Sequence, residues 1–214
     1  MSDESSRNQS DDSKRPRVLF VNRSYWPDAE ATGQLLTDLC ESLADEFDVH
    51  VLCGQPNSNP TDAEYSVRGT QIRNHVTIHR LKHSQFNKRR GWGRMANLLT
   101  FTWAARSWMR ARQRSANKNQ QQAFDVVISE TDPFLLPIVT APFANRMNAP
   151  FVAYLQDIYP DIAVRLGAVS EGWKTRRIRA WLTSAYQDAA RIIVLSQQMQ
   201  DRLVGWGLPE ERFV

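Results

Sequence analysis

Carboxylates, hydroxyls and amides recur in this sequence directly after short apolar runs. Asp157 and Asp161 follow one such run, within the segment QDIYPD, and carboxylates in such a position can orient a hydroxyl group or take up its proton. Other runs are followed or closed by a polar residue, namely Ser129, Gln156 and Ser196. If the runs are parallel strands, all of these side chains gather at one edge of a sheet and form a single cleft.

The first apolar run is followed by the loop segment YWPDAEATG, which leads into a helical pattern. Thr32 is the expected N-cap, and from Gly33 onward the leucines recur on one helical face. The N-terminus of such a helix offers unpaired N–H groups to an anion. However, the loop has a single glycine where a dinucleotide fingerprint needs three, and the sequence contains no GxxxxGK[ST] motif. An NAD-binding Rossmann domain is therefore disfavoured.

Six runs of strand length alternate with segments of helical period. This alternation predicts an α/β fold with a doubly wound, mostly parallel, Rossmann-like sheet. The predicted strands are 18–21, 48–53, 76–81, 125–129, 151–155 and 192–195, with the start of another at 212–214. The predicted helices are 33–43, a long one from Trp92, 134–147, 171–189 and 197–206. We expect Ser196 to be the N-cap and Gly207 the C-cap of the last helix, and 117–122 to be a loop.

Positive charge is concentrated in the middle of the chain. Between Tyr65 and Phe124 there is no Asp or Glu, whereas the same stretch holds 13 of the 27 basic residues. A region of one sign recruits an anionic partner such as phospholipid, a lipid pyrophosphate or nucleic acid, unless it is simply a solvated surface. No RNA-binding or DNA-binding motif is present, so nucleic acid is disfavoured.

The long helix from Trp92 has arginines near both ends and apolar residues around much of its circumference. It could pack on the sheet as a crossover, or lie partly in a membrane interface with Trp and Arg at headgroup depth. The two arrangements are compatible if only the side of the helix that faces the sheet is buried. An anionic membrane surface is therefore an expected partner.

The remaining composition narrows the class of protein. Residues 1–16 are polar, which predicts a disordered tail rather than a secretory signal, and no apolar run reaches the roughly 20 residues of a spanning helix. Two isolated cysteines indicate a reduced, cytoplasmic protein. His75, His79 and His83 are spaced four apart, but their surroundings indicate a strand and no carboxylate or cysteine is near. We expect neither a metal nor another cofactor.

Four segments resemble the N-terminal domain of GT-B glycosyltransferases of family 4. In chain order they are YWPDAEATGQLLTDLCESLA, DPFLLP, PFVAYLQDIYPDIAVRLG and ARIIVLSQQMQDRLVGWGLPEERF. Their order and spacing are most similar to those of bacterial exopolysaccharide, O-antigen and colanic acid transferases. The resemblance extends over residues 17–214.

The resemblance implies that residues 17–214 are the acceptor-side domain, and that a second Rossmann-like domain, absent from this chain, binds the nucleotide sugar. Transfer would occur between the domains without a metal. Ala31, Thr32 and Gly33 would face the donor diphosphate, where many relatives carry a glycine pair. Replacing Gly33 by a bulky residue should then abolish transfer and leave folding nearly intact.

The same resemblance assigns the polar residues after the fifth strand. Gln156 stands where many relatives have a histidine, and Ser129, Gln156 and Ser196 would contribute to substrate binding. Asp157 and Asp161 would orient the acceptor hydroxyl or sugar. The alternative for these two carboxylates is that they cap the short helix IAVRLG.

The combined prediction is sugar transfer from a nucleotide sugar to a lipid-linked or saccharide acceptor in cell-surface polysaccharide biosynthesis. The expected location is the cytoplasm, peripherally at the inner face of the cytoplasmic membrane. Without the second domain, the chain alone should bind a UDP-sugar weakly at most and be inactive. The alternative is a non-catalytic subunit that recruits the acceptor or the membrane for a separately encoded catalytic half.

Overall fold

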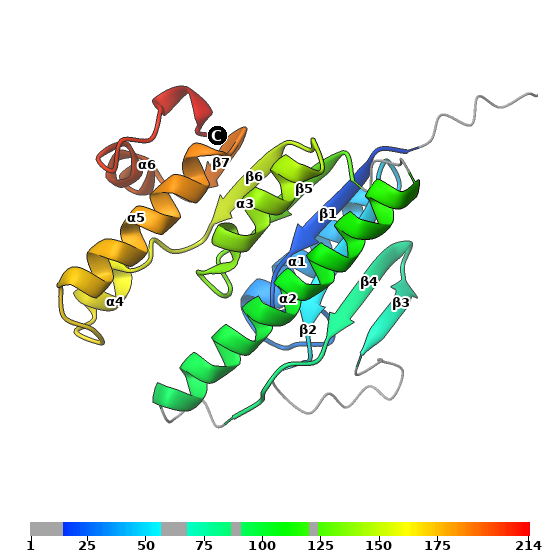
Figure 1. Cartoon of the computed structure of the whole chain (residues 1–214), viewed down its shortest axis with the longest axis horizontal. Coiled ribbons are helices and arrows are strands. Elements are labelled where there is room, and N and C mark those ends of the chain that lie inside the picture. The colour runs from blue at the N-terminus through cyan, green and yellow to red at the C-terminus, as the bar shows by residue number, and fades with distance from the viewer. Residues whose placement is uncertain (1–14, 57–67, 87–90, 120–123) are drawn as a thin grey trace, which may run out of the picture.

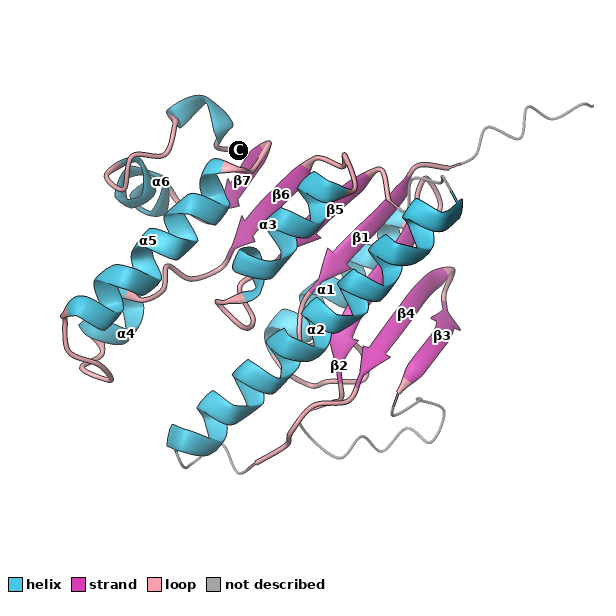
Figure 2. Cartoon of the chain, viewed as in Figure 1, coloured by secondary structure: helices cyan, strands magenta, loops and turns pink. Residues whose placement is uncertain are grey.

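The computed structural model describes residues 15–56, 68–86, 91–119 and 124–214 and is built around a seven-stranded sheet (Figures 1 and 2). The strands are β1 (Arg17–Val21), β2 (Asp48–Gly54), β3 (Gly69–Arg73), β4 (Val76–Leu81), β5 (Val126–Ser129), β6 (Phe151–Leu155) and β7 (Arg191–Val194). Their spatial order is β3-β4-β2-β1-β5-β6-β7, and every neighbouring pair is parallel except β3 with β4. The predicted doubly wound, mostly parallel α/β sheet is confirmed.

Helices connect the strands and cover both faces of the sheet. They are α1 (Ala31–Leu43), α2 (Gly91–Asn119), α3 (Leu136–Arg146), α4 (Asp161–Arg165), α5 (Trp173–Gln187) and α6 (Gln197–Val204), followed by a single 3₁₀ turn, η1 (Glu210–Arg212). Figure 1 shows α2, α3 and α5 in front of the sheet and α1 behind it. No helix in the described segments combines the length and apolarity needed to cross a membrane.

Alternate residues of β1 point into two separate cores. Val18 and Phe20 are buried in the core on the α1 side, and Leu19 and Val21 in the core that α2, α3 and α5 cover. Such burial on both faces explains why the run VLFV is continuously apolar rather than alternating. The central strand is thereby fixed in register, and with it the loop that follows at residue 22.

The connections reverse direction beside β1. From β1 the chain passes through α1 to β2 on one side, whereas from β5 it passes through α3 to β6 on the other side and on the opposite face. The carboxyl ends of β1 and β5 therefore flank the topological switch point, where open α/β sheets bind their ligands.

The strand β3 was not predicted. It pairs antiparallel with β4 at the sheet edge, through a tight turn in which Asn74 and His75 adopt positive φ angles of 45° and 64°. Its sequence GTQIR is mostly exposed and polar, and Ile72 is 72% exposed. An edge strand of this kind has no buried face to produce an apolar pattern, so the prediction of six strands was wrong by one.

Several helix ends differ from the prediction. α1 begins at Ala31 with Glu30 at the N-cap position, so the assignment of Thr32 as N-cap was wrong. α6 ends at Val204 with Gly205 as C-cap, so Gly207, whose φ is 89°, lies beyond the cap. α5 is shorter at both ends than predicted. The helix α2 continues through 117–119, where a loop was expected, and 120–122 lie outside the described residues.

Two other expectations about the C-terminal part are confirmed. Ser196 is the N-cap of α6, where its Oγ accepts a hydrogen bond from the Met199 backbone N–H at 3.3 Å. Phe213 forms a parallel bridge with Ile192 of β7, and the Val214 N–H donates to the Ile192 carbonyl at 3.0 Å. The last residues therefore begin strand-like pairing at the free edge of β7. Most of the predicted tail, residues 1–14, lies outside the described residues.

Candidate active site

The loops that follow β1, β5 and β6 meet because these strands are neighbours in the sheet. Between them lies a pocket of about 330 Å³. It is lined by Arg23, Glu30 and Thr32 from the first loop and α1, by Thr131 and Asp132 after β5, by Gln156, Asp157 and Tyr159 after β6, and by Arg94, Asn97 and Leu98 of α2. The sequence prediction that polar clusters converge on one cleft is therefore correct for three of its four junctions.

A buried ion pair fastens two of these loops together. The Arg23 guanidinium donates from Nε to Asp132 Oδ1 at 3.2 Å and from Nη2 to Asp132 Oδ2 at 2.9 Å. The Ser24 hydroxyl lies 3.0 Å from both Asp132 Oδ2 and Glu30 Oε2. The Arg23 side chain is only 8% exposed. A bidentate pair in this position fixes the distance between the carboxyl ends of β1 and β5 before any ligand binds.

The first turn of α1 borders the same pocket, but its three predicted residues are placed differently. Thr32 lines the pocket and Ala31 is exposed. Gly33 is buried, and a Cβ atom added there would lie 3.3 Å from Ser24 Cβ and 3.3 Å from the Tyr25 backbone nitrogen. This glycine therefore allows α1 to pack closely on the preceding loop. Because the contacting atoms include backbone, the structure favours destabilisation by a bulky residue here over the nearly intact folding expected from the sequence.

Helix α2 closes the pocket on the face of the sheet that α2, α3 and α5 cover. The buried Asn97 side chain accepts a hydrogen bond from the Phe86 N–H at 2.9 Å and donates to the Phe86 carbonyl at 2.9 Å. Ser84 Oγ also donates to Asn97 Oδ1, at 3.0 Å. These bonds hold the N-terminal part of α2 on the chain that leaves β4. The helix turn that carries the exposed Arg94 is therefore held at the pocket wall.

A second, larger groove continues from the first pocket along the sheet edge. It measures about 710 Å³ and lies beyond the carboxyl ends of β6 and β7. Gln156 and Asp157 line both spaces, whereas Asp161, Arg165, Ser196 and Arg202 line only the groove. The exposed Asp157 carboxylate thus stands where the two spaces meet, and it forms no ion pair with any described residue. Ser196 was expected in the same cleft and lies in this extension of it.

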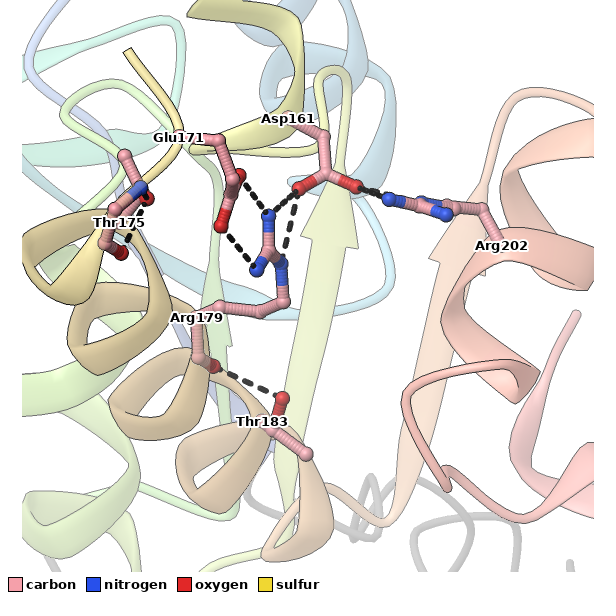
Figure 3. Close-up of polar contacts among 7 residues, drawn as sticks. Asp161, Glu171, Thr175, Arg179, Thr183 and Arg202 are labelled. Carbon is pink, nitrogen blue, oxygen red and sulfur yellow. Dashed lines mark hydrogen bonds and ion pairs between the residues drawn. The ribbon is translucent and has the colours of Figure 1, made fainter. Parts of the chain in front are cut away.

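Asp161 is held by two arginines (Figure 3). Arg179 donates from Nε and Nη2 to Asp161 Oδ1 at 3.0 and 2.7 Å, and Arg202 donates to Asp161 Oδ2. Glu171 also pairs with Arg179, at 3.1 Å, so the network ties α4, α5 and α6 together. Both Asp161 oxygens are occupied, which leaves this carboxylate less able than Asp157 to accept a substrate proton. No side chain among the described residues forms a capping hydrogen bond at the N-terminus of α4, so the capping alternative is not supported.

The carboxyl end of β5 carries a buried acid that sequence reasoning did not single out. Glu130 is 1% exposed, and its Oε2 has no hydrogen-bond partner among the described residues. Burial, reinforced by the negative charge of Asp132, raises the pKa of Glu130 to about 8. The Glu130 side chain is therefore protonated at neutral pH. The preceding Ser129, a predicted binding residue, is fully buried, donates to the Glu130 carbonyl, and lines neither space.

Within the described parts of the chain, no three His, Cys, Asp or Glu side chains are grouped so that they could hold a metal ion. The three histidines that share a spacing of four residues do not share a helix face. His79 lies in β4 and contacts His50 of β2 at 3.0 Å, and His83 follows the end of β4. The strand interpretation of this segment is confirmed.

Arg23, Glu30, Arg94 and Tyr159 line the pocket without having been predicted individually. The sequence does contain a signal for Arg23. Arg23 and Asp132 have opposite charges, and each follows a buried strand by two or three residues. Recognising the pair requires knowing that β1 and β5 are adjacent, which the sequence pattern alone does not state. Arg94 reaches the pocket from α2, whose N-terminus does not directly follow any of the strand ends at which the polar clusters were predicted.

Comparisons with known proteins identify the family and the fold. A sequence profile of the glycosyl transferase 4-like domain matches residues 31–214. The fold is similar to HepE of Anabaena in complex with UDP, with a TM-score of 0.53 and 15% identity over 92% of this chain and 43% of HepE. It is also similar to sucrose-phosphate synthase of Thermosynechococcus elongatus, with a TM-score of 0.51 and 12% identity over 90% of this chain and 45% of the synthase. No curated protein sequence is significantly similar.

The HepE structures include complexes with UDP, with UDP-glucose, and with UDP and glucose, and this chain spans less than half the length of HepE. The shared architecture is the mostly parallel sheet with helices on both faces. The profile match covers most of the chain and includes α1, β5, β6 and every loop at the pocket except the one after β1. The chain therefore belongs to the glycosyl transferase 4-like family and is a glycosyltransferase domain with the Rossmann-like fold of the GT-B enzymes.

Proposed function

We propose that this chain is the acceptor-side domain of an enzyme that transfers a sugar from a nucleotide sugar to a lipid-linked acceptor in cell-surface polysaccharide biosynthesis. The family assignment supports sugar transfer, and the UDP and UDP-glucose complexes of HepE support a nucleotide-sugar donor. A second Rossmann-like domain would present the donor across the cleft. The lipid-linked acceptor is argued from α2.

The observation that carries the acceptor proposal is the division of α2 into two faces. Arg94, Asn97 and Leu98 line the pocket. The opposite side of the same turns exposes large apolar side chains at a spacing of three to four residues, namely Trp92 (59% exposed), Met95 (47%), Leu99 (50%) and Trp103 (71%). Figure 1 shows these N-terminal turns projecting past the arrowheads of β1 and β5. We call these four side chains the apolar stripe.

A soluble monomer rarely exposes so many large apolar side chains in one line, and tryptophan is enriched where proteins meet the membrane interface. With the apolar stripe in the interface, the pocket on the other side of α2 lies within reach of a lipid headgroup. The acceptor sugar would then enter the pocket from the membrane side, and its lipid would stay in the bilayer. This location, peripheral at the cytoplasmic face, is part of the proposal.

Within the cleft, the roles follow from charge and accessibility. Asp157, exposed and without an ion pair to any described residue, would accept a hydrogen bond from the acceptor hydroxyl and orient it toward the donor sugar. Thr32 and the free N–H groups of residues 31–33 would face the donor diphosphate, favoured there by the helix dipole. Arg94 would add positive charge, and Gln156 a hydrogen-bonding side chain. Asp161 and Ser196 would shape the groove through which the acceptor extends, with no metal or other cofactor.

The transfer itself can be measured in membranes. Cells that express the full-length protein and cells that lack it are broken, and their membranes are incubated with radiolabelled nucleotide sugars. The proposal predicts label in the organic-solvent extract that depends on the protein. Protein-dependent label confined to water-soluble products would contradict the lipid-linked acceptor and leave sugar transfer intact.

The apolar stripe has a matched control. Leu99→Ser removes an exposed leucine from the stripe, and Leu35→Ser removes one that is 66% exposed on α1, on the opposite face of the sheet. The proposal predicts that only Leu99→Ser shifts the protein from the membrane to the soluble fraction. Equal behaviour of the two variants would count against membrane contact through α2.

A further inference from the structure

The outward side of α2 changes its chemistry halfway along the helix. Beyond the apolar stripe the same spacing continues with basic side chains, and these are Arg106, Arg110 and Arg114. From Trp92 to Arg114 the line extends about 33 Å, since a helix rises 1.5 Å per residue. The helix thus carries one straight outward line whose first half is apolar and whose second half is positively charged.

The basic half borders a groove of about 700 Å³ between α2 and α3. The three α2 arginines line it together with Arg146, the last residue of α3. Of its other walls, the α3 side is apolar, from Ile138, Val139, Pro142 and Phe143, and the α2 side adds Met109 and the polar Gln113 and Asn117. No acidic side chain of the described residues lines the groove, and it shares none of its lining residues with the candidate active site.

The four arginines are not neutralised within the described part of the protein. None forms an ion pair with a described carboxylate, whereas Arg17, Arg23, Arg73, Arg179 and Arg202 all do. Neighbouring arginines repel one another, so a cluster of four without counter-charge favours an anion that can contact several at once. A phosphate group has the oxygens to do so, and Arg binds phosphate in a bidentate manner.

The apolar walls decide which kind of phosphate fits. A free phosphate would leave the partly exposed Ile138, Val139 and Pro142 facing water, whereas a phospholipid brings hydrocarbon next to its phosphate. The arginine line also continues the apolar stripe in the same direction along α2. A flat surface that contacts one half would therefore contact the other.

We propose that the groove between α2 and α3 binds the phosphate of an anionic phospholipid in the membrane surface, with Arg106, Arg110, Arg114 and Arg146 around the phosphate and the apolar walls against the lipid. This site is separate from the acceptor pocket. This inference rests on the proposed function in one respect: it assumes that the surface contacted by the apolar stripe is a membrane. With both halves engaged, α2 lies along the bilayer and the pocket is held at a fixed distance from it.

The test is binding of the chain to vesicles of phosphatidylcholine alone and of phosphatidylcholine with one third phosphatidylglycerol, measured by flotation over a range of lipid concentrations. The test variant is Arg106→Gln with Arg110→Gln. The control, Arg68→Gln with Lys82→Gln, removes the same charge from exposed positions beside β3 and β4, at the far edge of the sheet. Gln and Arg have similar helix propensities, so the test variant should fold.

The inference predicts that the test variant loses about thirtyfold in affinity for phosphatidylglycerol vesicles, since each basic residue near an anionic surface contributes about fivefold. The control should lose no more than about twofold. Binding to pure phosphatidylcholine should be unchanged in both. Equal affinity of test variant and control for the anionic vesicles would overturn the inference.

Two further arms test the apolar stripe and the nature of the anion separately. Leu99→Ser should weaken binding to both kinds of vesicle, so its failure to do so would refute the apolar stripe and not the groove. Duplex DNA of 20 base pairs replaces the vesicles in the second arm. If the test variant lost DNA binding while retaining full affinity for the anionic vesicles, the arginines would belong to a nucleic-acid contact and the lipid site would be refuted.

Discussion

Arg23 and Asp132 form a bidentate ion pair between the loops that follow β1 and β5, with donor–acceptor distances of 3.2 and 2.9 Å. The Arg23 backbone N–H also donates to the Asp132 carbonyl, at 2.7 Å. These contacts lie at the switch point of the sheet, where the pocket opens. The two residues therefore set the spacing of the pocket walls and are expected to matter for stability as well as for substrate binding.

The first prediction concerns this pair. Asp132→Ala removes the bidentate partner of the buried Arg23 guanidinium and leaves it the Glu30 carboxylate, 3.5 Å away, so it should cost up to about 3–5 kcal/mol of the free energy of unfolding. Asp188→Ala is the control, because Asp188 is exposed and accepts a single side-chain hydrogen bond, from Asn145. It should cost less than about 1 kcal/mol. Urea unfolding followed by circular dichroism measures both, and similar costs would show that the pair is not effectively buried.

The second prediction concerns the packing of α1. Gly33→Ala should destabilise the protein by about 1–3 kcal/mol, because its Cβ would lie 3.3 Å from Ser24 Cβ and from the Tyr25 nitrogen. Gly91→Ala is the matched change at the start of α2, where an added Cβ meets nothing within 4 Å. It should be neutral or slightly stabilising. Thermal unfolding distinguishes the two, and an unaltered melting temperature for Gly33→Ala would refute the close contact.

The third prediction follows from the protonated state of Glu130. Its folded pKa of about 8 lies above the ordinary value of 4.5, so the folded protein holds a proton that the unfolded chain releases between these pH values. The stability contributed by Glu130 is therefore fully present below pH 4.5 and is lost as pH rises toward 8. Glu130→Gln removes this dependence and preserves the shape of the side chain.

The difference in stability between Glu130→Gln and the wild type should accordingly grow in favour of the variant as pH rises from 5 to 8, by up to about 1.4 kcal/mol per pH unit. Above pH 8 it should level off. Denaturant unfolding at a series of pH values provides the measurement. A difference that is constant with pH would mean that Glu130 is ionised in the folded protein.

The fourth prediction separates the roles of the two aspartates. Asp161→Ala removes both arginine contacts that join α4, α5 and α6 and should lower the melting temperature, by about 2–4 °C for each kcal/mol lost in a chain of this length. Asp201→Ala, on the exposed side of α6, loses only a hydrogen bond from Gln197 and should have little effect. If Asp161→Ala kept its melting temperature and lost all transfer activity, the carboxylate would instead act on the substrate.

Elements with a buried face were readily predicted from the sequence. β1 and β2 lie between two cores, so their apolar runs are continuous, and α6 has an N-cap serine in the expected place. The edge strand β3 has no such face, and it was missed. The N-terminus of α1 was misplaced by two residues because Glu30 occupies the N-cap position without a side-chain hydrogen bond, which leaves no capping signature.

The sequence predicts which residues lie near the site, because they follow strands, but not which charged residues pair with one another. Asp157, Gln156 and Thr32 were expected at strand or helix ends and do line the pocket. What the sequence does not reveal is which charged residues neutralise one another. Asp157 and Asp161 are equally acidic in the sequence, and only the approach of Arg179 and Arg202 from other helices distinguishes them. The identification of Arg94 likewise required the path of α2.

The central claim is that sugar transfer takes place at the pocket between the carboxyl ends of β1, β5 and β6, with Asp157 orienting the acceptor. Its most direct test compares Asp157→Asn with Asp38→Asn in the membrane transfer assay, using the full-length protein. Both carboxylates are exposed, but Asp38 lies on α1 outside the pocket. The account predicts at least a hundredfold loss of protein-dependent transfer for Asp157→Asn and an unchanged rate for Asp38→Asn. Equal rates for the two variants, with both proteins folded and membrane-bound, would contradict it.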